Sequence, residues 1–257
     1  MKRSPIFLAT DFGPGVYAGV LKAVIAGISP ETAVIDLTHD IPAQDIGLGV
    51  WQLQAALPYL PDGSILLAVV DPGVGTKRRA LCVDAGGVIA VGPDNGLLSC
   101  IAKEKRATVH AIENPEYALP NPSAVFHGRD IFAPAAAHLA RGLAPSKLGP
   151  AVKDMVEVEW EQPKAAPDGV KGVVLAVDRF GNLQTNIASA GIPEGSTVTL
   201  DSTRLGPIRR TYADVEDDCL VVLPGSSGFL EIACRNGSAA RKLRAGKDAT
   251  VFVRNPK

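Results

Sequence analysis

Several features that would assign a protein to a common class are missing from this chain of 257 residues. Aromatic residues make up only 5% of it, and no apolar run approaches the roughly 18 residues of a membrane-spanning helix. The net charge is −1, with acidic and basic residues interspersed, whereas nucleic acids and anionic membranes select for a basic face. We therefore expect neither a nucleic acid nor a membrane as a partner.

Common catalytic and metal-binding motifs are absent as well. The sequence contains no GxGxxG, GxSxG, HExxH or Walker loop, which argues against the usual dinucleotide-binding, serine hydrolase, metalloprotease and NTPase classes. The cysteines form no CxxC pair, so we expect no metal site and buried free thiols in a reducing cytoplasm; they are Cys82, Cys100, Cys219 and Cys234. The short basic start MKR and the brief apolar run after it predict no signal peptide.

The first half of the chain alternates strand-like and helix-like segments. Expected strands cover residues 6–10, 33–38, 64–70, 80–84, 88–92 and 107–113. Expected helices cover residues 16–28, 46–57 and 130–143, with a short one beginning near Asn95. Asp45 stands where it could cap the second helix. This alternation predicts an α/β domain with a largely parallel sheet and helices on both faces.

The character of the sequence changes after about Pro150. Short strand-like segments separated by Gly, Pro and Asn turns predict a smaller all-β domain of sandwich or barrel type. A charged, proline-containing stretch precedes them and is typical of a linker. We therefore predict an α/β domain over residues 1–155, a linker over 156–169 and a β domain over 170–257.

Two loops of the first domain carry the residues best suited to chemistry. DPGVGTKRR, which follows the expected strand at 64–70, contains Asp71 and Arg78, and FHGRD contains His127. The Asp–Arg pair could orient a water molecule or form a salt bridge that holds the loop, and the residues alone favour the salt bridge. His127 could act as a general base near neutral pH, or it could simply be hydrogen-bonded within its loop.

Other candidate binding residues give weaker signals. Asp11 follows the first strand and could accept hydrogen bonds from the two hydroxyls of a ribose, or cap the next helix. Asp178 and Asn182 surround a tight turn whose residue types are expected of any hairpin. Ser226 and Ser227 stand in a small-residue loop that could hold a ligand carboxylate, although a plain turn explains them too.

Taken together and in this order, the motifs are distinctive. They are TDFG, THDI, VVDPGVGTKRR, GPDNGLL, FHGRDIFAP, DRFGNLQTNI and SSGFLEIA, and they run from Thr10 to about Ala233. This succession closely resembles the S-adenosylmethionine (SAM) hydrolases, also called SAM hydroxide adenosyltransferases, which are related to adenosyl-fluoride and adenosyl-chloride synthases. The resemblance implies an α/β domain joined to a β-barrel-like domain in a homotrimer, with each ligand lying between two subunits. It implies cleavage of SAM by water at ribose C5′, giving adenosine and L-methionine, with SAM as substrate and no cofactor.

The resemblance also implies roles for individual residues. Asp71, Arg78 and His127 match the family's water-activating trio, while Arg79 is left as a loop or surface charge. The substrate contacts implied are Asp11 to the ribose diol, Asp178 to the methionine amine, Asn182 to adenine, and Ser226 and Ser227 to the methionine end. His127 could take the water proton while Asp71 and Arg78 fix the water, or Asp71 could hold the water itself.

Two other functions compete with hydrolysis. A halide-using relative needs no base, and in those relatives the Asp and His of the trio are replaced, whereas both are present here. A non-catalytic SAM or adenosine sensor would have no need of an Asp–Arg–His cluster near C5′. Both alternatives are therefore less favoured than hydrolysis.

Overall fold

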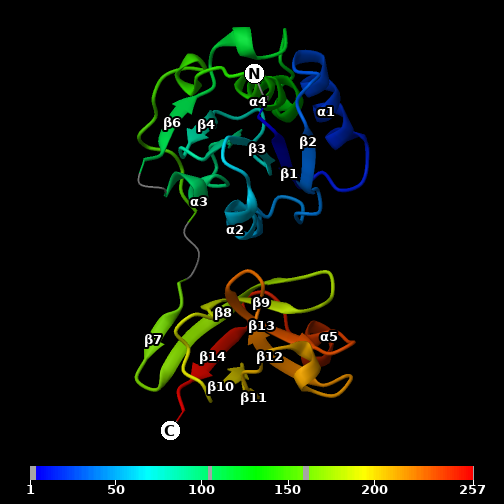
Figure 1. Ribbon diagram of the computed structural model, residues 1–257, viewed down its shortest axis with the longest axis vertical. Helices are drawn as coiled ribbons and strands as arrows, with labels where there is room; N and C mark the ends of the chain where they lie inside the picture. The colour runs from blue at the N-terminus through cyan, green and yellow to red at the C-terminus, as the bar shows by residue number, and fades with distance from the viewer. Residues whose placement is uncertain (1–3, 104–105, 159–161, 257) are drawn as a thin grey trace. The chain divides into compact units, whose positions relative to one another are not determined.

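The computed structural model describes residues 4–103, 106–158 and 162–256. The chain divides into two compact units, Met1–Glu159 and Trp160–Lys257. Figure 1 shows the helices of the first unit around its central sheet, and the second unit as a strand-rich body. Each unit has its own hydrophobic core, so each is described by itself.

A six-stranded sheet forms the centre of the N-terminal unit, in the order β2-β1-β3-β5-β4-β6. Its strands are β1 (Ile6–Thr10), β2 (Val34–Thr38), β3 (Ser64–Val69), β4 (Ala80–Asp84), β5 (Val88–Pro93) and β6 (Thr108–Ala111). The pairs β1–β2, β1–β3 and β3–β5 are parallel, whereas β4 runs antiparallel to both of its neighbours. The predicted α/β fold with a largely parallel sheet is confirmed. Strand β3 is buried along its whole length, as its uninterrupted apolar sequence indicates.

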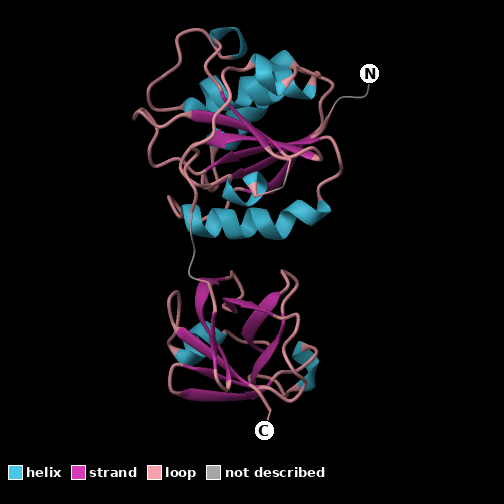
Figure 2. Ribbon diagram, turned by 90° about the vertical axis from the view of Figure 1, so that its left-hand side faces the viewer, coloured by secondary structure: helices cyan, strands magenta, loops and turns pink. Residues whose placement is uncertain are grey.

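Helices cover both faces of this sheet (Figure 2). The helices are α1 (Val16–Ile28), α2 (Ile46–Ala56), α3 (Ser99–Ala102) and α4 (Ala133–Ala140), with 3₁₀ turns at Leu57–Tyr59, Pro115–Tyr117 and Pro145–Lys147. Apolar side chains of α1 and α4 pack on β1 and β3 in one cluster. The predicted cap of α2 is confirmed, because Asp45 Oδ1 accepts a hydrogen bond from the Leu48 N–H at 2.9 Å. The helix expected from Asp130 begins earlier, with a π-helical turn at Gly128–Phe132 that leads directly into α4.

The C-terminal unit is an antiparallel sheet that nearly closes into a barrel. The main strands follow the order β11-β10-β14-β8-β9-β13-β12, and β7 pairs with β8 beside them. Their bounds are β7 Lys164–Ala166, β8 Gly169–Val177, β9 Leu183–Ala188, β10 Thr197–Leu200, β11 Thr203–Pro207, β12 Leu220–Pro224, β13 Phe229–Cys234 and β14 Thr250–Arg254. A 3₁₀ turn (Tyr212–Asp214) and helix α5 (Ala239–Leu243) complete it. The Arg209 N–H donates to the Val222 carbonyl at 2.7 Å, which brings the two edges together and confirms the barrel-like prediction.

Two details differ from the sequence predictions. Most of the stretch predicted as a linker, residues 156–169, is built into the units: Val156 and Val158 donate backbone hydrogen bonds to Asp94 and Ser99, and β7 pairs with β8. Backbone amides find partners there regardless of the charged side chains, so composition alone is misleading. Residues 159–161 of that stretch lie outside the described part. Cys82 and Cys234 are buried as expected, whereas Cys219 is exposed.

Candidate active site

The loop between β3 and β4 carries Asp71 near its start and Arg78 near its end, and these two side chains form a bidentate ion pair. Arg78 Nε donates to Asp71 Oδ1 at 2.9 Å, and Arg78 Nη2 donates to Oδ2 at 2.5 Å. The side chains are only 9% and 6% exposed. A buried pair with this fork geometry holds both groups in one orientation. The salt bridge expected from the sequence is therefore present.

His127 joins the same cluster from a loop that is distant in sequence. Arg78 Nη2 also donates to His127 Nδ1 at 2.8 Å, so the guanidinium lies between the carboxylate and the imidazole. The other side of the guanidinium packs over the Phe132 ring, 5.2 Å from its centroid. The structure thus brings together the three residues that the sequence singled out.

A close backbone contact holds the two loops together. Gly75, in the middle of the β3–β4 loop, has a φ of +79°, which favours glycine. A Cβ added there would lie 2.5 Å from the Ala124 carbonyl oxygen, three residues before His127. Only a residue without a side chain permits this approach.

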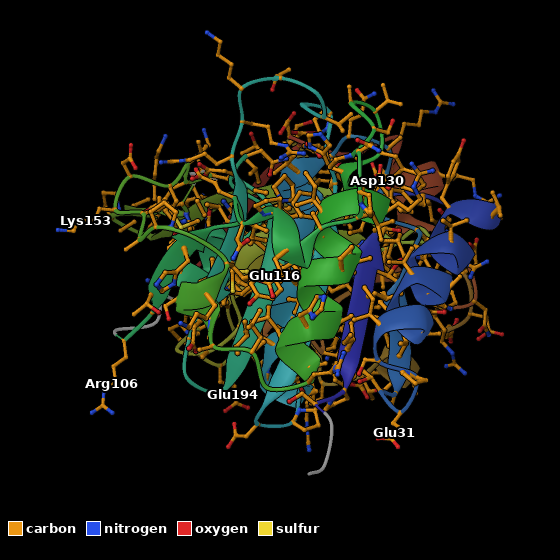
Figure 3. The ribbon with its side chains drawn as sticks, turned by 90° about the horizontal axis from the view of Figure 1, so that it is seen from above. Glu31, Arg106, Glu116, Asp130, Lys153 and Glu194 are labelled. Atoms are coloured by element: carbon orange, nitrogen blue, oxygen red, sulfur yellow. The ribbon has the colours of Figure 1, made fainter. Side chains whose placement is uncertain are left out.

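The surroundings of His127 favour its neutral form. Desolvation lowers the pKa of His127 below its usual range, and the Arg78 charge lowers it further, while Asp71 and Asp130 act in the opposite direction. Asp130, at the turn leading into α4 (Figure 3), is itself bound to Arg129 at 2.6 Å. Because Arg78 can only donate, Nδ1 of the neutral His127 is an acceptor and the ring proton is on Nε2.

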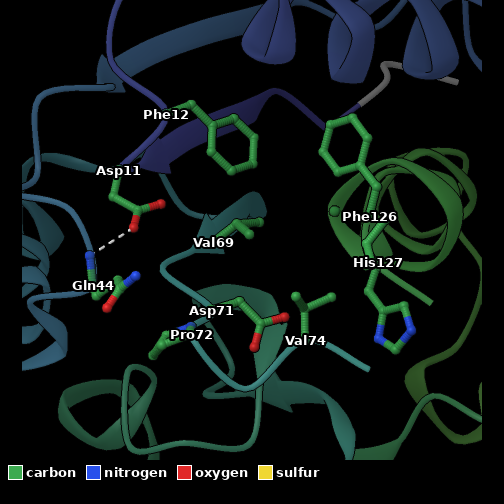
Figure 4. A pocket seen from close by; sticks show the side chains of 11 residues that line it. Asp11, Phe12, Gln44, Val69, Asp71, Pro72, Val74, Phe126 and His127 are labelled. Carbon is green, nitrogen blue, oxygen red and sulfur yellow. Dashed lines mark hydrogen bonds between the residues drawn. The ribbon is translucent and has the colours of Figure 1, made fainter. Parts of the chain in front are cut away.

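A pocket of about 290 Å³ opens beside this cluster. Figure 4 shows Phe12 and Phe126 on one side of it, with Asp71 and His127 on the other. Asp11, also in the lining, accepts a hydrogen bond from the Gln44 N–H at 2.9 Å through Oδ2. The pocket therefore combines an apolar aromatic wall, a carboxylate near its edge and the Asp–Arg–His cluster.

Two candidate residues of the C-terminal unit, Asp178 and Asn182, lie around the β8–β9 turn. Asp178 Oδ1 accepts from the N–H groups of Phe180 and Asn182, and Oδ2 accepts from Asn182 Nδ2 at 3.0 Å. Asn182 also lines a surface pocket of about 620 Å³ together with Tyr212 and Arg235. In this unit Asp178 serves the turn, as the sequence alone suggested, and its carboxylate is held in a fixed position beside the pocket-lining Asn182.

The loop that contains Ser226 and Ser227 is a tight turn between β12 and β13. The Gly225 N–H donates to the Phe229 carbonyl and the Gly228 N–H donates back to Gly225. Ser226 is exposed, whereas the Ser227 hydroxyl is buried and has no hydrogen-bond partner among the described residues. The structure therefore shows a turn at this position, as the residues alone suggested.

Comparison with known proteins covers both units. Residues 6–149 match the family model of the SAM hydroxide adenosyltransferase N-terminal domain, and residues 172–252 match that of the C-terminal domain. This chain belongs to the SAM hydroxide adenosyltransferase family.

Relatives of this family member include named enzymes and a solved structure. The (R)-S-adenosyl-L-methionine hydrolase of Thermus thermophilus is 45% identical over 248 residues, covering 93% of this chain and 95% of that protein. A fluorinase of Actinopolyspora mzabensis is more distant, at 27% identity over 271 residues and 90% of each chain. The crystal structure of an uncharacterized conserved protein from Thermotoga maritima superposes with a TM-score of 0.89 at 34% identity, covering 96% of this chain and 99% of that chain.

Sequence reasoning missed several residues of this family member's sites. Phe12, Phe126 and Gln44 line the first pocket, and Gln44 has a φ of +66°, which is unusual for a residue other than glycine. In the C-terminal unit, the buried Glu231 accepts from Tyr212 Oη at 2.5 Å and from Gln184 Nε2 at 2.6 Å. The Phe residues directly flank Asp11 and His127, and that adjacency was the available signal.

Arg79 is a partly exposed loop charge, as expected, and the structure also gives it specific partners. Its Nε donates to the buried carboxylate of Asp94 at 2.7 Å, and its Nη1 donates to Asp154 at 2.7 Å. The side chain is only 32% exposed. Adjacent arginines therefore have different partners: Arg78 joins the cluster, and Arg79 ties the start of β4 to Asp94.

Neither a metal-binding cluster nor a membrane-spanning helix is found among the described residues. No group of three or more His, Cys, Asp or Glu side chains is arranged to hold a metal ion in that part of the chain. No helix within the described ranges has the length and apolarity needed to cross a membrane. Charged side chains such as Arg106 and Lys153 extend from the periphery of the N-terminal unit (Figure 3).

Proposed function

We propose that this chain is an enzyme that hydrolyses SAM to adenosine and L-methionine. The observation that carries the proposal is the joint presence of Asp71, Arg78 and His127 in one hydrogen-bonded cluster beside a pocket. A binding protein has no need of such a cluster, and a halide ion needs no base. The family membership and the hydrolase relative support the same reaction.

The chemistry suits this set of groups. A water oxygen forms a bond to ribose C5′, the C5′–S bond breaks, and its electron pair neutralises the sulfonium. Methionine therefore leaves as a neutral thioether, and neither a general acid nor a metal ion is required. What the protein must supply is an oriented water molecule in a pocket with little other water, and a group that takes one proton from it.

The hydrogen bonds favour Asp71 as the group that takes the proton. Arg78 occupies the Nδ1 lone pair of His127, so accepting a proton there would require this bond to break. Each Asp71 oxygen retains a second lone pair beside its bond to Arg78. In our proposal Asp71 accepts the water proton, the His127 Nε2–H holds the water oxygen, and Arg78 fixes both partners.

For substrate binding we propose the contacts that the family resemblance implies. Asp11 binds the ribose diol, Asp178 binds the methionine ammonium, and Asn182 contacts adenine. The hydroxyls of Ser226 and Ser227 contact the methionine end. Loss of SAM affinity without loss of the fold in an Asp11→Ala variant is the expected result, and unchanged affinity would contradict the ribose contact.

We also propose that the chain works as a homotrimer in the cytoplasm, with each site completed by a neighbouring subunit. Exposed apolar side chains around the first pocket support this: Val125 is 77% exposed, and Tyr17, which packs against Phe126, is 55% exposed. Phe180, at the edge of the second pocket, is 74% exposed. Sedimentation should show a trimer at concentrations where the enzyme is active, and a fully active monomer would contradict the shared site.

One experiment distinguishes hydrolysis from its alternatives. Purified protein incubated with SAM should release adenosine and methionine at equal rates, with or without chloride in the buffer. Chromatography identifies the products. Formation of 5′-chloroadenosine would indicate a halogenase, and unchanged SAM with measurable binding would indicate a sensor.

A further inference from the structure

The motif GPDNGLL contributes two polar residues that the proposed mechanism does not use. Asp94 is buried and Asn95 is half-buried. They directly follow β5. We propose that Asp94 and Asn95 are positioning residues that hold the two ends of the loop carrying Asp71 and Arg78. The inference rests on the proposed function, because it concerns the geometry of the water-activating trio.

The sheet topology explains why these two residues reach both ends of the loop. Strand β5 lies between β3, where the loop begins, and β4, where it ends. In the parallel pair β3–β5, Leu67 lies opposite Val91. In the antiparallel pair β4–β5, Ala80 lies opposite Pro93. The residues that follow β5 are therefore placed between the last residues of β3 and the residues that precede β4.

Asn95 holds the beginning of the loop. Its Nδ2 donates to the Val70 carbonyl at 2.8 Å, immediately before Asp71, and its Oδ1 accepts from the Leu97 N–H at 3.1 Å. Val70 is fully buried, so this carbonyl has no water to bond with in place of Asn95. The amide thus fixes the backbone from which the Asp71 carboxylate projects.

Asp94 holds the end of the loop. Its side chain is 3% exposed and accepts from Arg79 Nε at 2.7 Å and from the Val156 N–H at 2.8 Å, one bond to each oxygen. Its own N–H donates to the Arg79 carbonyl at 2.9 Å. That carbonyl also accepts from Arg78 Nη1 at 3.2 Å, so Asp94 fixes an acceptor on which the Arg78 guanidinium rests.

The consequence for the trio is electrostatic as well as geometric. The charged groups that face His127 are Arg78, Asp71 and Asp130. Arg78 lowers the pKa of His127, so a displaced Arg78 would let that pKa return toward its usual range. A protonated His127 cannot accept from Arg78, so activity should fall as pH decreases through this pKa. This fall at low pH is the acid limb of the pH profile. Because displacing Arg78 raises the pKa of His127, it moves the acid limb to higher pH.

The variant Asp94→Asn tests the proposal, with Asp154→Asn as its matched control. Asp94→Asn keeps the shape, but an amide cannot accept through both of its terminal atoms, so either Arg79 or Val156 loses its bond. Asp154→Asn removes the other carboxylate bound to Arg79, which is 84% exposed, and leaves Asp94 intact. We expect Asp94→Asn to lower kcat by about ten- to a hundredfold, with a smaller change in KM for SAM, and to move the acid limb upward. The Asp154→Asn control should match wild type in kcat, in KM for SAM and in the position of the acid limb.

A second variant and a second readout keep the test decisive. Asn95→Ala removes the donor to the Val70 carbonyl and should lower kcat without the same pH shift. This variant tests the proposal independently if Asp94→Asn does not fold. Titration of the His127 imidazole by NMR needs no turnover, so it remains informative if the protein does not hydrolyse SAM. An unmoved His127 titration and unchanged kcat in a folded Asp94→Asn variant, or equal losses in the Asp154→Asn control, would overturn the proposal.

Discussion

Replacing His127 by alanine is expected to lower kcat for SAM hydrolysis by about 10²–10⁴-fold, the usual contribution of a group that handles the proton or orients the attacking water. Alanine removes the acceptor for Arg78 Nη2 and the Nε2–H donor together. The acid limb of the pH profile should disappear with the imidazole. Single-turnover kinetics with SAM, combined with thermal unfolding to verify the fold, would measure both effects.

A comparison with His127→Asn separates the two proton assignments. An asparagine can accept from Arg78 and donate to water, but it cannot take up a proton. Partial recovery of kcat relative to His127→Ala would support Asp71 as the acceptor, and no recovery would return that role to His127. Turnover close to wild type in both His127→Ala and Asp71→Ala would exclude the trio from catalysis.

The second large effect is expected from Gly75→Ala, which touches none of the trio. The added Cβ would meet the Ala124 carbonyl oxygen at 2.5 Å, so the loops bearing Arg78 and His127 must move apart by several tenths of an ångström or more. Because reacting groups misplaced by about 1 Å can cost about a hundredfold in rate, we expect a fall in kcat of about that size. The positive φ adds a stability cost of about 1–2 kcal/mol.

Gly86→Ala is the control for backbone strain. Gly86 has a φ of +86° in the β4–β5 turn, and a Cβ there would meet nothing within 4 Å. It should lose similar stability and retain kcat, as measured by denaturant unfolding and steady-state kinetics. If both variants lose kcat equally, strain and not the contact between the loops is responsible.

Much of the fold follows from local patterns. The apolar run at β3, the helical spacing of α1 and the Asp45 cap each act over a few residues, so they can be recognised without tertiary information. Long-range pairing is harder to recognise from local patterns, as one short strand shows. Strand β7 forms because it pairs with β8 at the edge of the barrel, although its composition resembles a linker.

The candidate site shows the same division. The residue types in DPGVGTKRR and FHGRD, together with their order among the other motifs, were enough to name the trio and the family's reaction. The resemblance selects Arg78 over Arg79, but residue type alone does not distinguish two adjacent arginines. Their roles differ because each pairs with a different buried carboxylate just before β4 begins. Arg78 pairs with Asp71, and Arg79 pairs with Asp94.

The sequence by itself therefore determined which chemical groups this protein carries and which family it resembles. Only the tertiary structure decided that Asp71 and His127, 56 positions apart, share one guanidinium through hydrogen bonds of 2.5 and 2.8 Å. It also placed Asn95 against the Val70 carbonyl and Asp94 against the Arg79 carbonyl, at the two ends of the β3–β4 loop. The physical reason is that hydrogen bonds act over about 3 Å, whereas the chain segments that supply these groups meet only when β3, β5 and β4 pair and Gly75 lets two loops touch.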